Sequence, residues 1–139
     1  MNYINENKII QAMKCNNYSK CYIIKNNFHR VCLFASNKGY IIGISLPSEN
    51  NPYFDFGELE QTNDNNISLM CSSRLHISSN KFEKSLKRII NNIEKSIIIE
   101  QNINLYDKNM KRKIIFSNIN KAISLYAKCN NYTDIIQKY

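Results

Sequence analysis

Histidine and cysteine are the side chains in this chain that could support nucleophilic catalysis. His29 and His76 are the two histidines, and Cys32 and Cys71 lie in stretches with strand character, where adjacent strands could bring a thiol beside an imidazole. Buried cysteines usually behave as small hydrophobic residues, and no feature of the sequence supplies the electropositive surroundings that activate a thiol. We therefore expect no catalytic site, and an enzyme built on cysteine and histidine is the third of three hypotheses.

Metal ligands and phosphate-binding loops are not predicted either. The five cysteines are scattered and form no C-x-x-C pair, and no histidine, cysteine or acidic residues stand at a spacing that fixes metal geometry. Gly39, Gly43 and Gly57 are too far apart to form a glycine-rich phosphate loop. We expect neither a bound metal nor a cofactor.

Acidic residues gather in one region of an otherwise basic chain. The formal net charge is +8, yet no lysine or arginine occurs between Lys38 and Arg74, and this region holds five of the 11 acidic residues. Three aromatic residues lie among them in the stretch ENNPYFDFGELE. Exposed aromatic residues ringed by charges are typical of protein interfaces, which predicts a partner-binding surface loop. The candidate partner-binding residues are Glu49, Tyr53, Phe54, Asp55, Phe56, Glu58, Glu60 and Asp64.

The same stretch has a purely structural interpretation. The rings of Phe54 and Phe56 could hold the loop against the core while the acidic side chains face water, and residues 53–56 show the short alternation of an edge strand. The sequence alone leaves both interpretations open.

Basic residues recur on two predicted helices, at residues 80–99 and 107–128. Lysine and arginine on these helices could contact the phosphates of a nucleic acid, each contact adding to a salt-dependent affinity. Lysine on a helix is more often just the solvated face, and no aromatic residues are interleaved for base stacking. Nucleic-acid binding is therefore the second hypothesis.

Helices and strands that would position these residues follow from periodicity and turn signals. We expect an N-terminal helix over residues 5–14 with Asn5 as its cap, and strands at 21–25, 30–36, 40–46 and 68–77. Residues 37–39 suit a hairpin loop that ends in Gly39, and residues 48–66 are predicted to be a long surface loop. The two basic helices and a short helical turn at 133–138 complete an α+β domain. Its predicted architecture is a mostly antiparallel sheet of about four strands packed with helices.

Domain count and cellular location follow from length and from the absence of targeting signals. A chain of 139 residues suits a single domain, 1–139. The N-terminal residues lack a signal peptide, no apolar run is long enough for a membrane helix, and an odd number of scattered cysteines suits a reducing environment. We expect a cytoplasmic protein without a membrane partner.

The stretches RVCLFASNKGYIIGISLP, NPYFDFGELE and LMCSSRLHISS, which lead into an amphipathic helix, give the chain a resemblance to a known family. In general character, residues 21–99 resemble the immunity proteins of bacterial contact-dependent growth inhibition systems. That resemblance implies an antitoxin that binds the toxic domain of a cognate secreted effector, often a nuclease, and occludes its active site. The acidic region would complement the electropositive cleft of such a nuclease.

Overall fold

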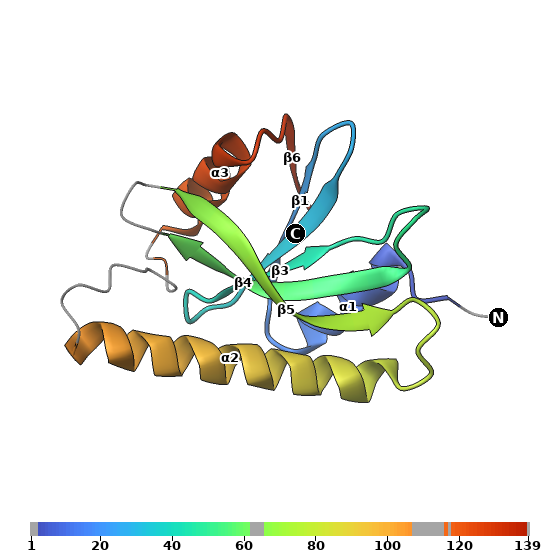
Figure 1. Ribbon diagram of the computed structural model, residues 1–139, viewed down its shortest axis with the longest axis horizontal. Helices are drawn as coiled ribbons and strands as arrows, with labels where there is room; N and C mark the ends of the chain where they lie inside the picture. The colour runs from blue at the N-terminus through green and yellow to red at the C-terminus, as the bar shows by residue number, and fades with distance from the viewer. Residues whose placement is uncertain (1–2, 62–65, 107–115, 117, 139) are drawn as a thin grey trace.

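The computed structural model describes residues 3–61, 66–106, 116 and 118–138, which form three helices and six strands (Figure 1). In chain order they are α1 (Glu6–Cys15), β1 (Lys20–Lys25), β2 (Arg30–Ala35), β3 (Ile41–Ser45), β4 (Tyr53–Gln61), β5 (Ile67–His76), α2 (Phe82–Tyr106), α3 (Ile119–Cys129) and β6 (Asp134–Gln137). The predicted α+β class is confirmed.

The strands form one antiparallel sheet with the order β5-β4-β3-β2-β1-β6. From β1 to β5 each strand pairs with the next in the chain, and β6 returns to pair with the outer side of β1. β5 and β6 are therefore the two edges. The sheet has six strands rather than the four expected, because β4 and β6 were not predicted as strands.

Helices cover both faces of this sheet (Figure 1). α1 and α2 pack on one face against alternate strand residues such as Cys21, Ile23 and Phe34. α3 packs on the other face against the intervening residues, such as Tyr22 and Leu33. Because side chains alternate between the faces of a strand, a sheet covered on both sides needs continuous apolar runs. This explains why β1 and β2 have no polar face.

A capping side chain and residues with positive φ determine where several of these helices and strands begin or end. The Asn5 side chain accepts a hydrogen bond of 2.9 Å from the Lys8 backbone N–H and so caps α1, as predicted. Gly39 has φ 84° in the β2–β3 turn, a conformation that side chains with a Cβ rarely adopt. Asn17 (φ 72°) and Asn131 (φ 59°) take left-handed conformations just after α1 and α3, which asparagine tolerates better than most residues.

Two predicted elements were wrong. Residues 48–66 are not one long loop, because β4 occupies 53–61 and pairs with a strand on each side. Residues 133–138 are not helical, because Asp134–Gln137 adds to the open edge of β1. In both places pairing with a strand distant in sequence outweighs the local pattern. The predicted helix over 107–128 is described only in part, since residues 107–115 and 117 lie outside the described residues.

Among the described residues, no helix has both the length and the apolar character that crossing a bilayer requires.

Candidate functional site: a buried carboxylate cluster and an exposed β4–β5 patch

β4 presents the predicted partner-binding residues on two opposite faces of the sheet. Phe54 is 2% exposed and Phe56 is fully buried, and both pack in the core beneath α1 and α2. Their rings are not on the surface, so the predicted exposed aromatic loop does not exist as such. Glu58 and Glu60 follow on the same face and are also buried.

The remaining candidates are on the surface or outside the described residues. Glu49 is exposed in the turn before β4, where Ser48 and Asn51 form a bridge. Tyr53 and Asp55 are half-buried on the face of β4 opposite Phe54. Asp64 lies outside the described residues. The sequence pattern thus located the acidic strand but not the direction in which its side chains point.

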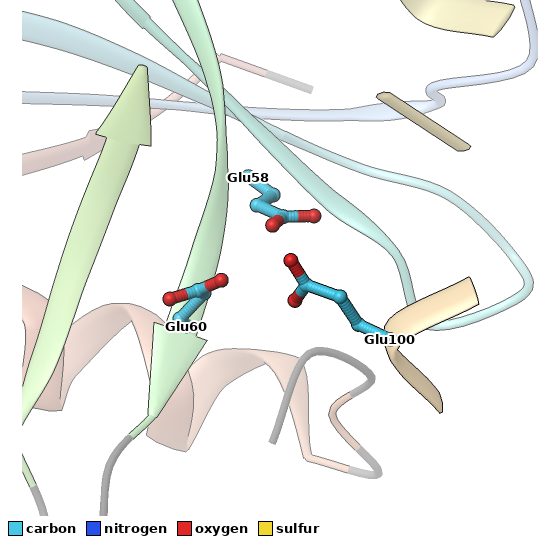
Figure 2. A group of neighbouring side chains, drawn as sticks. All are labelled: Glu58, Glu60 and Glu100. Carbon is cyan, nitrogen blue, oxygen red and sulfur yellow. The ribbon is translucent and has the colours of Figure 1, made fainter. Parts of the chain in front are cut away.

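Glu58 and Glu60 meet a third carboxylate, Glu100 of α2. One carboxylate oxygen from each residue lies within 4.8 Å of the other two, and the residue surfaces of Glu58 and Glu60 are only 7% and 3% exposed. Figure 2 shows the carboxyl groups of Glu58 and Glu100 directed toward each other, with Glu60 alongside. We call these three residues the carboxylate cluster.

Sequence reasoning missed Glu100, although a signal was present. The apolar stripe of α2 includes Ile93 and Ile97, and Glu100 is the next residue at helical spacing. In the same way, Glu58 and Glu60 continue the alternation begun by Phe54 and Phe56. A carboxylate that takes the next position of a buried stripe is a sign of a buried polar site.

The cluster lines a cavity of about 230 Å³ between β4, β5 and α2. Met70, Ser72 and Ser96 line it together with the three glutamates, and Met70 and Ser72 are exposed. A register shift between Phe56 and Gly57 gives β5 one additional residue, so that Ser72 lies between the partners of these two β4 residues. Such a bulge bends a strand locally, and here it adjoins the mouth of the cavity.

Burial, together with the neighbouring carboxyl groups of Glu60 and Glu100, raises the pKa of Glu58 from the usual 4.5 to about 8. The Glu58 Oε2 atom is buried and has no hydrogen-bond partner. A desolvated carboxylate is unfavourable beside other carboxylates unless a proton or a positive charge is shared among them. The cluster can therefore hold a proton, a cation or a cationic group of a ligand.

A second group of residues lies on the opposite face of β4, at the Tyr53–His76 end of the β4–β5 pair. Opposite pairs in the ladder are Tyr53 with His76 and Asp55 with Arg74. Arg74 Nε donates to Asp55 Oδ1 at 2.8 Å, and its guanidinium carbon lies 4.6 Å from the centre of the Tyr53 ring. The rings of Tyr53 and His76 meet edge to face with centroids 5.0 Å apart. We call these four residues the β4–β5 patch.

The cysteines considered as nucleophiles lack the properties of reactive thiols. The Cys21 side chain, burial and Glu6 all raise the pKa of the Cys32 thiol. Burial and the charge of Asp55 raise the pKa of Cys71. A nucleophilic cysteine needs the opposite shift, because the thiolate is the reactive form.

The contacts around the two histidines are typical of residues with a structural role. His76 Nδ1 accepts a hydrogen bond of 3.1 Å from the Ser78 backbone N–H and lies 2.6 Å from the Ser78 hydroxyl, while its ring packs on Tyr53. His29 is exposed at the end of the β1–β2 turn, and its backbone N–H donates to the Asn26 side chain. These contacts give neither imidazole a cysteine partner.

The basic residues of α2 are on the surface. The predicted basic helix over residues 80–99 has five lysine and arginine residues, and all are exposed: Lys81 just before α2, and Lys84, Lys87, Arg88 and Lys95 within it. On α3, Lys121 is exposed too. The basic residues between 108 and 113 lie outside the described residues.

Comparisons with protein-family models, with characterised proteins and with solved structures each found no significant match to this chain. The resemblance to immunity proteins therefore rests on the character of residues 21–99.

Proposed function

We propose that the chain is an immunity protein that binds and neutralises a cognate secreted toxin domain, with a nuclease as the expected toxin. The observation that carries the proposal is the β4–β5 patch, in which a tyrosine and an arginine are held by their neighbours on an open part of the sheet. Tyrosine and arginine are over-represented among the residues that dominate binding energy at protein interfaces.

The geometry of the patch favours recognition without rearrangement. The Arg74 side chain is 57% exposed, yet it is held by Asp55 and by the face of the Tyr53 ring. Side chains that are ordered before binding lose less conformational entropy in the complex. The patch belongs to β4 and the edge strand β5, so a partner can approach it from the side of the sheet that has no neighbouring strand.

Glu49 supplies an exposed carboxylate near the patch. Asp55 is also at the surface, but its charge is offset by Arg74. A nuclease cleft is electropositive because it holds phosphates, so the Glu49 carboxylate would favour its encounter with this face. Occlusion of the active site follows from the resemblance to immunity proteins.

Co-expression with the toxin tests the proposal. The proposal predicts that a gene for a large secreted protein lies directly upstream, and the C-terminal domain of that protein is the test toxin. The chain should restore growth and co-purify with that domain. Replacing Tyr53 and Arg74 by alanine should abolish both effects, since the substitutions remove the aromatic and cationic contacts from the surface. Glu58 and Glu60 are unsuitable for this test because they are buried.

A matched control is the pair Lys84→Glu and Lys87→Glu on α2, which also changes two exposed side chains. This variant should protect cells as well as the natural chain does. Absence of protection by the natural chain rules out the immunity function. Full protection by the Tyr53 and Arg74 variant would show that the toxin binds another surface of the chain.

Nucleic-acid binding is the second candidate, and one observation favours it. The four basic residues of α2 are all exposed, so they can approach phosphates.

A further inference from the structure

We infer that Glu58 and Glu60 of β4 and Glu100 of α2 form a binding site for a divalent cation of the oxygen-preferring class, with Ca²⁺ as the best fit. The inference goes beyond the proposed function and does not depend on it. It is also the opposite of the sequence-based expectation, because the three ligands come from two elements and show no local spacing.

The distances within the carboxylate cluster match the size of a cation. One oxygen from each glutamate lies within 4.8 Å of the other two. Ca²⁺ binds oxygen at about 2.3–2.6 Å, so two ligands on opposite sides of the ion are separated by about 5 Å at most. Mg²⁺ binds at about 2.0–2.1 Å and requires a tighter arrangement. Separations of up to 4.8 Å therefore fit a Ca²⁺ ion.

Glu58 supplies an independent indication that something is bound there. This residue is 93% buried on the basis of its 7% exposure, and its Oε2 atom has no hydrogen-bond partner. Figure 2 shows its carboxyl group directed into the cluster, toward Glu100. Buried polar atoms are nearly always satisfied, and a carboxylate oxygen left without a partner in this position suits an ion.

The cavity offers space and further ligands. Its volume of about 230 Å³ exceeds the roughly 30 Å³ that one water occupies in the liquid, so water can complete the coordination of an ion. Ser72 and Ser96 line the cavity and add hydroxyl groups near it.

Calorimetric titration of the chelator-treated full chain with CaCl2 tests the site. The natural chain should bind one Ca²⁺ ion, and the heat of binding should saturate at millimolar CaCl2. MgCl2 should bind more weakly. Glu58→Gln and Glu100→Gln should each lower Ca²⁺ affinity at least about tenfold, because each removes one charged ligand.

Glu83→Gln is the matched control, since Glu83 is an exposed carboxylate at the start of α2, and this variant should bind Ca²⁺ like the natural chain. Glutamine at position 58 or 100 leaves a neutral side chain of similar size, and a circular-dichroism spectrum verifies folding. No binding by the natural chain at millimolar CaCl2 and about pH 8.5 overturns the inference. Undiminished binding by both glutamine variants overturns it as well. None of these outcomes bears on toxin neutralisation, which is measured separately.

Discussion

The buried carboxyl group of Glu58 makes the stability of the folded protein depend on pH. Its pKa in the folded protein is about 8, against an ordinary value of 4.5. The folded state therefore holds this proton more tightly than the unfolded state does. Without a cation, the contribution of Glu58 to stability is fully present below about pH 4.5 and is lost as pH rises through about 8.

In the presence of a chelator, the melting temperature should fall as pH increases from about 5 to about 8.5, because Glu58 must ionise next to Glu60 and Glu100. Glu58→Gln should make this fall clearly smaller, since the amide cannot ionise. Differential scanning fluorimetry across this pH range measures both curves, and Glu83→Gln should retain the natural slope. Identical slopes for the natural chain and Glu58→Gln would show that another group is responsible.

β4 contributes side chains both to the core and to the surface. Phe54, Phe56, Glu58 and Glu60 face α2, whereas Tyr53 and Asp55 face the other way. The strand therefore places the carboxylate cluster beneath α2 and contributes half of the β4–β5 patch on the opposite surface. Substitutions on its two faces should have different consequences.

Phe56→Ala should lower the free energy of unfolding by about 3–5 kcal/mol, because it removes a fully buried ring and leaves a cavity. Tyr53→Ala, three positions earlier on the same strand, should lower it by less than about 1.5 kcal/mol, since the ring is half-buried at the surface. Urea denaturation of the two variants measures this difference. Similar losses would contradict the assignment of the two side chains to a core and a surface face.

Gly57 is required at the bulge because β5 approaches it closely. A Cβ at this position would lie 2.1 Å from the Met70 carbonyl oxygen and 2.6 Å from the Cys71 Cα, so the backbone of β5 would have to move. Gly57→Ala should therefore lower the free energy of unfolding by about 1–3 kcal/mol or more.

Gly43 provides the comparison on the neighbouring strand β3. A Cβ there would meet Leu69 Cδ1 at 2.5 Å and Leu33 Cδ2 at 3.0 Å, which are the ends of flexible side chains. Gly43→Ala should be the milder of the two substitutions, because these leucines can adopt other rotamers. Chemical denaturation ranks the pair, and a larger loss for Gly43→Ala would contradict the bulge geometry.

On the scale of the whole molecule, charge is unevenly distributed between the described surfaces. The exposed face of α2 carries lysine and arginine, while the carboxylate cluster is enclosed beneath the same helix. The net charge of +8 will thus promote general attraction to polyanions through α2 and not through the β4–β5 patch. Attraction of this kind is not specific recognition.

Replacing Lys84, Lys87 and Arg88 by glutamine should lower the salt concentration at which the protein elutes from a heparin column. Each substitution removes a positive charge that can contact an anionic group of heparin, as it would contact a phosphate of a nucleic acid. The same variant should still neutralise the toxin in the co-expression assay, since these residues lie on α2. Loss of neutralisation would instead show that the toxin binds α2.

The sequence by itself determined the elements whose signals are local. The apolar runs of β1, β2 and β3, the Asn5 cap, Gly39 in the turn and the apolar stripe of α2 could be predicted because each depends on residues only a few positions apart. The distribution of charged residues along the sequence identified the acidic stretch around β4 as unusual. It could not distinguish a surface loop from a strand, since asparagine and acidic residues outweigh a short alternation.

Only the tertiary structure decided which way β4 faces, that residues 134–137 pair with β1, and that Glu100 joins Glu58 and Glu60. Each of these features depends on contacts between residues far apart in sequence, where burial and strand pairing outweigh local propensity. The carboxylate cluster exists because α2 lies across β4, and no spacing along the chain encodes that crossing.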